Sequence, residues 1–157
     1  MSLTDTAVFR RAAFDDINAI VDLLNKFAAQ GVILPRTYRE VATTVDQFIV
    51  ASLADVTVGC VTLKNYGQGL FEVRSLAVSP NVQGGGIGSQ LVLEAREAAQ
   101  KMNASRIFAL TYRPHLFEQL NFHQVKKELF PQKVWNDCSR CPKRDRCDEI
   151  AVLLKCP

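Results

Sequence analysis

Apolar and polar residues alternate along the chain in a series of short helix-like and strand-like segments. From Asp15 and Asp16 to Gly31, apolar side chains recur every three or four residues, which predicts an amphipathic helix that the aspartates cap and the glycine ends. Thr37 and Glu40 have the spacing of a capping box and predict the start of a second, short helix. The apolar stripe of the first helix consists of Ile17, Ile20, Val21, Leu24, Phe27 and Ala28.

Runs rich in β-branched and aromatic residues predict the strands of a sheet. Ala54 and Asp55 separate two of these runs as a hairpin turn does, and Pro114 can start a short helix that Asn121 ends. A longer helix presents one apolar stripe, formed by Ile87, Leu91, Ala95, Ala98 and Met102. The expected strands cover residues 8–12, 48–53, 56–63, 70–78, 106–111, 122–125 and 150–154. Because strands and helices interleave, the sequence predicts one α/β domain over residues 1–157, which includes a cysteine-containing segment at 131–149.

The composition is that of an ordinary globular protein. Of the 157 residues, 48% are hydrophobic and 22% are charged, and no apolar stretch approaches the roughly 18 residues that would cross a bilayer. The first residues carry neither the basic segment nor the apolar run of a secretion signal, so we expect a cytoplasmic protein without a membrane partner. A formal charge of +3, without a basic stripe, also argues against a nucleic-acid partner.

The glycine-rich segment after the strand at 70–78 is the first candidate for chemistry. Four of the five residues from Gly84 to Gly88 are glycine, and the predicted long helix starts among them. The first turn of a helix presents backbone N–H groups without partners and is electropositive, and glycine lets an anion approach that backbone. The segment therefore predicts a phosphate-binding loop, and the alternative is a loop whose glycines only turn the chain tightly.

The spacing of these glycines excludes two common nucleotide-binding motifs. Ser89 stands where a dinucleotide fingerprint that begins at Gly84 needs its third glycine, and no acidic residue ends a strand about 20 residues further on. No Gly-Lys-Ser/Thr follows, so a P-loop is excluded as well. What remains is Gln83-x-x-Gly86-x-Gly88, directly after a strand that ends Leu-Ala-Val.

That motif resembles the pyrophosphate-binding loop of the GNAT superfamily of N-acetyltransferases, and the order of elements agrees over nearly the whole chain. The resemblance implies a central mixed, mostly antiparallel sheet flanked by helices, with acetyl-CoA as cosubstrate. It also implies that the main chain of Leu76, Ala77 and Val78 pairs with the pantetheine arm of that cosubstrate. The loop residues that would wrap the pyrophosphate are Gln83, Gly84, Gly85, Gly86, Ile87, Gly88 and Ser89.

The segment at 116–122 is similar to the second CoA-side element of this superfamily, which makes Phe117 a further cofactor-binding candidate. Many members have a tyrosine at this position that protonates the leaving thiolate, whereas this chain has phenylalanine. Tyr112, just after the strand at 106–111, is then a candidate proton donor, and its alternative is a purely structural tyrosine.

Other segments resemble stand-alone relatives of the acetyltransferase domain of N-acetylglutamate synthase, namely residues 31–36, 59–64, 108–111 and 133–138. In that family, basic side chains and a hydroxyl hold a dicarboxylic amino acid. The matching positions here are Arg36, Lys64, Thr111 and Arg146. An arginine can bind a carboxylate bidentately, and a lysine acts as a point charge. Taken singly, each cation could equally be a solvated surface residue, and Thr111 could cap a neighbouring turn.

Glu72 is the candidate general base. It lies on the strand that leads to the glycine loop, and two-residue alternation predicts that it shares a face with Arg74, Leu76 and Val78. Through a water molecule, Glu72 could take the proton that the acceptor amine must lose before it attacks the thioester. A backbone N–H near Leu76 to Val78 could stabilise the oxyanion. The alternative for Glu72 is an ion pair with Arg74 or another cation.

The C-terminal part holds three cysteines within ten residues, Cys138, Cys141 and Cys147. Their spacing resembles half of a zinc site, which could be completed by Cys156, His123 or Asp148. A second Cys-x-x-Cys pair is missing, so reduced packing or surface thiols are favoured over a structural zinc. The interleaved cations would make such thiols sensitive to oxidation.

The sequence thus predicts an enzyme that moves the acetyl group of acetyl-CoA to the amine of a small amino acid by direct attack in a ternary complex. The resemblance makes L-glutamate the first acceptor, and arginine biosynthesis the setting. The alternatives are acetylation of a polyamine, a drug or a protein amine, and a non-catalytic acyl-CoA-binding or redox-responsive module. Pairing of edge strands could give a homodimer.

Overall fold

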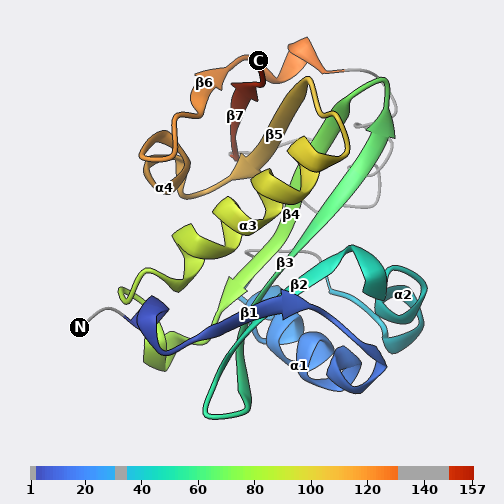
Figure 1. Ribbon diagram of the computed structural model, residues 1–157, viewed down its shortest axis with the longest axis vertical. Coiled ribbons are helices and arrows are strands. Elements are labelled where there is room, and N and C mark those ends of the chain that lie inside the picture. Colours follow the sequence, from blue (N-terminus) through green and yellow to red (C-terminus); the bar gives the residue numbers. More distant parts are fainter. Residues whose placement is uncertain (1–2, 31–34, 131–148) are drawn as a thin grey trace.

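The computed structural model describes residues 3–30, 35–130 and 149–157, and within these residues one seven-stranded sheet has the order β1-β2-β3-β4-β5-β7-β6 (Figure 1). The strands are β1 (Val8–Arg11), β2 (Phe48–Leu53), β3 (Val56–Gly67), β4 (Leu70–Val78), β5 (Arg106–Thr111), β6 (His123–Val125) and β7 (Ile150–Lys155). The helices are α1 (Ile17–Ala28), α2 (Tyr38–Thr43), α3 (Ile87–Lys101) and α4 (Pro114–Glu118). One-turn 3₁₀ helices lie at Leu3–Asp5, Phe14–Asp16, Val45–Gln47, Pro80–Val82 and Lys127–Leu129. All strand pairs are antiparallel except β4 with β5, which confirms the predicted mixed, mostly antiparallel sheet.

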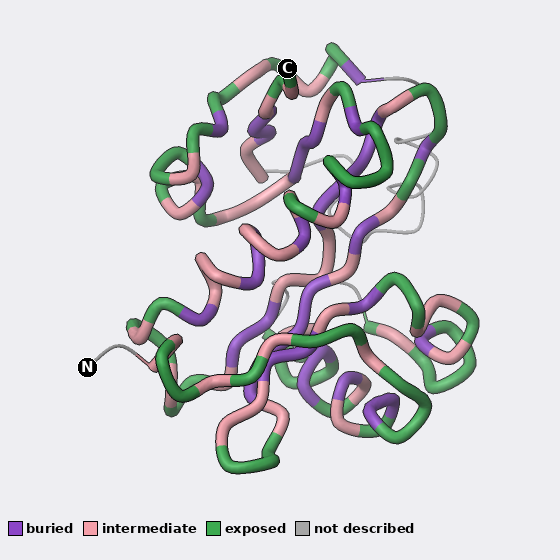
Figure 2. The backbone as a smooth tube through the Cα atoms, in the orientation of Figure 1, coloured by how far each residue is buried: buried purple, intermediate pink, exposed green. Residues whose placement is uncertain are grey.

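The sheet separates two apolar layers. On one face, α3 and α4 pack against side chains such as Val61 and Val73, and on the other face α1 and α2 pack against Val50 and Cys60. Buried residues follow the central strands and the inner sides of the helices, whereas the edge strand β1 is largely exposed (Figure 2). In the described ranges, no helix is long and apolar enough to cross a membrane.

Several turns and one helix cap form where the sequence predicts them. Ala54 and Asp55 both adopt left-handed backbone conformations, with φ of 49° and 65°, as a two-residue hairpin requires. The Thr37 hydroxyl accepts the backbone N–H of Glu40 at 3.1 Å, which confirms the capping box at the start of α2. Asn121, with φ of 73°, turns the chain after α4.

The predicted cap of the first helix is wrong in detail. The Asp16 side chain makes no cap hydrogen bond to α1. Its carboxylate instead accepts the backbone N–H of Ala13 at 2.7 Å and binds the Arg10 guanidinium, so it fixes the turn before the helix. α1 ends at Ala28, and the predicted stop at Gly31 lies outside the described residues.

Two other predictions needed correction because tertiary pairing outweighs local sequence. β3 continues four residues beyond the predicted end at residue 63, since β4 pairs with it along this extension. Met102 lies beyond the end of α3 and is 47% exposed, so it does not belong to the apolar stripe. The buried face of α3 consists of Ile87, Leu91, Val92, Ala95 and Ala99.

A β-bulge interrupts the ladder between β3 and β4. Thr62 lies opposite Arg74, whereas Cys60 lies opposite Ala77, so β4 carries one extra residue between these pairs. Ser75 sits in this bulge with φ of 53°, a left-handed conformation that is uncommon for a residue with a side chain.

The bulge reverses the alternation of side chains along β4. Leu76 and Val78 belong to the layer under α3, whereas Glu72 and Arg74 lie before the bulge on the opposite face. The prediction that these four residues share one face is therefore wrong, because two-residue alternation does not hold across an inserted residue.

β4 and β5 form a short parallel ladder and then separate. They pair only over Leu70 to Glu72 and Arg106 to Phe108, although β4 continues to Val78. Residues 73–78 consequently have no strand partner on this side within the part of the chain that the structure describes. Their main chain is positioned to pair with an extended ligand.

Candidate active site

The glycine loop lies between the end of β4 and the start of α3. The Gln83 side chain amide donates to the backbone oxygen of Val78 at 3.0 Å, which ties the beginning of the loop to the end of the strand. Gly84 and Gly86 have φ of 86° and 90°, so both occupy the left-handed region where glycine is favoured. These two residues give the loop its sharp path into α3.

The start of α3 fits an anionic group. Gly86 is the N-cap residue, no side chain caps the helix, and the first turn contains no acidic residue. Backbone N–H groups and the positive end of the helix dipole therefore face the loop. A Cβ at Gly84 would have no atom within 4 Å, so this part of the backbone is open to a ligand.

The other residues of the loop have packing constraints. A Cβ at Gly85 would collide with the Leu3 side chain, and one at Gly88 would lie 3.4 Å from the Leu116 side chain. Ile87 is buried beneath the loop, and Ser89 is half-buried in the first turn of α3. The groups that this loop offers to an anion are thus mainly backbone N–H groups.

Phe117 belongs to the core. Its ring packs edge-on against Phe122 with the ring centres 5.3 Å apart, and the side chain is only 3% exposed. A phenyl ring also has no proton to give to a thiolate. Any contact of Phe117 with CoA would therefore come from its backbone.

Glu72 lies at the last position of the β4–β5 ladder, opposite Lys64 on β3. Its carboxylate is buried, and Oε1 accepts a hydrogen bond from the Tyr66 hydroxyl at 2.7 Å. The Arg74 Nε lies 3.7 Å from the same oxygen. The ion pair that was the alternative interpretation of Glu72 is present, but the shorter contact is with a neutral hydroxyl.

Lys64, Tyr66, Glu72 and Arg74 thus form one cluster on the face of the sheet opposite α3. The Lys64 ammonium lies 4.9 Å from the centre of the Tyr66 ring. Sequence reasoning named Lys64 and Glu72 but missed Tyr66. Tyr66 could have been found from its position two residues after Lys64, which places it on the same strand and next to the glycine hairpin that joins β3 to β4.

The remaining predicted site residues make contacts of their own. The Arg36 guanidinium is 3.7 Å from Glu40 Oε2, and its backbone N–H donates to Asn25 Oδ1 at 3.2 Å. The Thr111 hydroxyl accepts the backbone N–H of Arg113 at 2.8 Å, which is the turn-capping alternative.

Alternation along β5 places Thr111 on the α3 face with Ile107 and Ala109, so the structure does not bring it together with Glu72. Tyr112 is half-buried in the turn after β5. Arg146 lies outside the described residues.

Two cysteines are described, and both are free thiols. Burial raises the pKa of the Cys60 thiol to about 12, so it stays protonated at neutral pH. Cys156 is half-buried. Among the described residues, no three His, Cys, Asp or Glu side chains gather in a way that could hold a metal ion. The proposed partial zinc site, formed by Cys138, Cys141 and Cys147, lies outside these residues.

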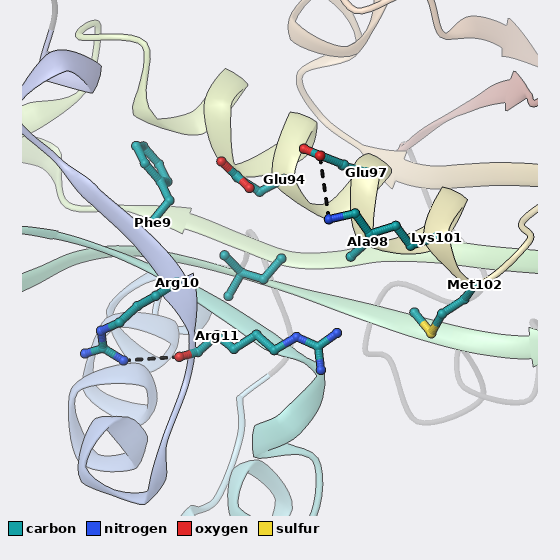
Figure 3. Close-up of a pocket in the computed structure, with 9 residues that line it drawn as sticks. Phe9, Arg10, Arg11, Glu94, Glu97, Ala98, Lys101 and Met102 are labelled. Carbon is teal, nitrogen blue, oxygen red and sulfur yellow. Dashed lines mark hydrogen bonds and ion pairs between the residues drawn. The ribbon is translucent and has the colours of Figure 1, made fainter.

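A separate groove of about 230 Å³ lies between β1 and α3 (Figure 3). Glu94, Glu97 and Lys101 project into it from α3, and Lys101 pairs with Glu97 at 3.7 Å. None of the site residues predicted from the sequence lines this groove. We therefore place the candidate chemistry at Glu72 and the glycine loop.

Known proteins match this chain over most of its length. Residues 44–124 match the model of the acetyltransferase (GNAT) domain family. An uncharacterized N-acetyltransferase from Chlorobaculum tepidum is 35% identical over 98% of this chain and 98% of its own length. An amino-acid acetyltransferase from Ralstonia nicotianae is 31% identical over 87% of this chain, which covers only 31% of that longer protein.

Solved structures share the fold. N-acetylglutamate synthase from Neisseria gonorrhoeae, complexed with coenzyme A and N-acetyl-glutamate, superimposes with a TM-score of 0.85 at 24% identity, over 95% of this chain and 35% of that one. A Mycobacterium tuberculosis protein in complex with CoA gives a TM-score of 0.82 at 25% identity, over 96% of this chain and 99% of that one. Each of these two superpositions covers at least 95% of this chain.

Proposed function

Because this chain belongs to the GNAT family and is an acetyl-CoA-dependent N-acetyltransferase, we propose that it acetylates the amine of a small amino acid, with L-glutamate the first candidate. The observation that carries the proposal is the cationic setting of Glu72, with Lys64 opposite it and Arg74 beside it. Such a setting favours an acceptor that brings carboxylates and disfavours a polyamine. Relatives named amino-acid acetyltransferase support the same choice.

The cosubstrate fits the loop and the separated strands. Gly84, Gly86 and the first turn of α3 would bind its pyrophosphate, and the main chain of residues 76–78 would pair with its pantetheine arm. When bound, the thioester supplies an electrophilic acetyl carbon. The open backbone at Gly84 and the uncapped helix start support this assignment.

The residues of the chain then have distinct tasks. Glu72 accepts the proton of the acceptor amine on its carboxylate, directly or through water. Lys64 and Arg36 bind the carboxylates of the acceptor, and a backbone N–H between Leu76 and Val78 stabilises negative charge on the acetyl oxygen. Tyr112 is our candidate to protonate the thiolate, since Phe117 cannot. A cytoplasmic setting in arginine biosynthesis and a homodimeric state go with this proposal.

Thiol release from acetyl-CoA, measured with a panel of acceptors, tests the proposal. The panel contains glutamate, glutamine, aspartate, spermidine and a lysine peptide. We expect the highest kcat/KM with glutamate, and about tenfold higher KM for glutamate in Arg36→Ala, which corresponds to roughly 1.4 kcal/mol. Arg39→Ala is the matched control, because Arg39 is an exposed arginine on the adjacent helix α2. Preference for spermidine or the peptide would refute the acceptor proposal without affecting the family assignment.

A further inference from the structure

The hydrogen bond between Tyr66 and Glu72 is buried, and neighbouring side chains hold the tyrosine in place. Tyr66 is 8% exposed and Glu72 is 7% exposed, and the Tyr66 hydroxyl oxygen lies 2.7 Å from Glu72 Oε1. The Tyr66 ring lies 5.9 Å from the ring of Phe108, which in turn stacks on Phe130 at 4.2 Å. Lys64 lies over the Tyr66 ring. Aromatic and cationic neighbours thus hold the Tyr66 ring and, with it, the position of the hydroxyl oxygen.

The backbone conformation around Tyr66 also supports this contact. The register between β3 and β4 shifts between Asn65 and Gly67, so Tyr66 occupies an irregular position in the ladder. The Asn65 side chain accepts the backbone N–H of Gly67 at 2.8 Å, and Gly67 adopts φ of 86°. This local structure sets the tyrosine at the end of a strand, where its hydroxyl reaches the carboxylate on the neighbouring strand.

We propose that Tyr66 is a positioning residue for Glu72, an inference that rests on the proposed function of Glu72 as the base. A phenol stays neutral near pH 7, so its hydrogen bond orients the carboxylate without cancelling its charge. The same bond favours the ionised carboxylate, which is the form that accepts a proton. Within the part of the chain that the structure describes, the charged or titratable groups that face Glu72 include Lys64 and Tyr66 from β3 and Arg74 from β4, and β5 presents the apolar Phe108.

A double-mutant cycle tests this inference with Tyr66→Phe, Glu72→Gln and the combination. Tyr66→Phe keeps the ring and its packing, so it removes the hydroxyl alone. We expect kcat to fall about tenfold, KM for acetyl-CoA to stay unchanged, and the acidic limb of the pH–rate profile to move to higher pH. In the Glu72→Gln background, the same substitution should cause no further loss. Tyr38→Phe is the control, because Tyr38 is 51% exposed on α2.

Three outcomes separate this inference from the proposed function. Normal kcat and an unchanged pH profile in Tyr66→Phe would overturn the positioning inference alone. Additive losses in the double variant would also overturn it, because they would show that Tyr66 acts independently of Glu72. A Glu72→Gln enzyme with wild-type turnover on its best acceptor would overturn the base assignment, and the inference with it.

Discussion

Two buried carboxylates, Asp16 and Glu72, differ in the groups that hold them. Their side chains are 8% and 9% exposed. Asp16 accepts two hydrogen bonds from the Arg10 guanidinium, at 2.7 and 2.9 Å, and a third from the backbone N–H of Ala13. Glu72 Oε1 accepts a hydrogen bond from the Tyr66 hydroxyl at 2.7 Å, and Arg74 Nε lies 3.7 Å from the same oxygen. Asp16 is bound bidentately by a guanidinium, whereas Glu72 accepts a hydrogen bond from a hydroxyl group.

The two carboxylates thus differ in role, since Asp16 belongs to a structural ion pair and Glu72 is the base that we propose. The Arg10 guanidinium lowers the pKa of Asp16, so this carboxylate stays ionised and joins β1 to the turn before α1. Glu72 lies instead where β4 and β5 begin to separate, on the strand that leads to the glycine loop. Burial and a fixed orientation are conditions under which a carboxylate can take a proton from a bound substrate.

The largest effect is expected when each carboxylate is replaced by its amide. Glu72→Gln should lower kcat/KM by at least about 100-fold, because the amide cannot accept the proton. Asp16→Asn should retain the turnover of the wild type, since Asp16 belongs to the structural pair. Steady-state kinetics under saturating acetyl-CoA measure kcat and kcat/KM for both variants. Equal losses in the two variants would break the distinction between them.

A matched pair of glycines sharpens the contrast between structure and site. Gly84 and Gly67 both have φ of 86°, and a Cβ at either would meet no atom within 4 Å. Alanine at each position should therefore cost a similar strain, roughly 1 kcal/mol. Only Gly84→Ala should weaken CoA binding, by about tenfold, because only this backbone lies in the loop that we propose binds the pyrophosphate. Titration calorimetry with CoA measures the two affinities, and equal values would argue against the loop assignment.

Stability should respond most clearly at Asp16. Asp16→Asn weakens charge-assisted hydrogen bonds to Arg10, whose side chain is partly exposed, so we expect a loss of about 1 kcal/mol in the free energy of unfolding. Urea unfolding at pH 7 measures it. Lys101→Met is the control, because the Lys101–Glu97 pair is fully on the surface and should contribute little. A larger loss in the control would contradict the assignment.

The same ion pair predicts a small pH dependence. The pKa of Asp16 is lowered in the folded protein relative to its ordinary value of 3.8, so the unfolded chain binds this proton more readily. The stabilisation by Asp16 is therefore present above about pH 4 and is lost as the pH falls through the lower, folded pKa. The difference in unfolding free energy between the wild type and Asp16→Asn should shrink between pH 7 and pH 3. A constant difference would show that the charge of Asp16 is not what stabilises the fold.

The order of helices and strands could be predicted from the sequence, and so could the glycine loop. Hydrophobic periodicity and turn residues act over a few positions, which is why the hairpin at Ala54 and the capping box at Thr37 are confirmed. The surroundings of Glu72 could be predicted only in part. Its pairing with Arg74 follows from neighbouring positions on one strand, but the contact with Tyr66 depends on the irregular register of β3 against β4.

By itself, the sequence determined the α/β class, the glycine-capped start of α3 and the acetyltransferase family, because each depends on residue types at short, fixed spacing. Only the tertiary structure decided which side chains share a face. The extra residue at Ser75 turns Leu76 and Val78 towards α3 and leaves Glu72 with Lys64 and Tyr66. A bulge is set by how two strands pair, and that pairing is a property of residues that lie far apart along the chain.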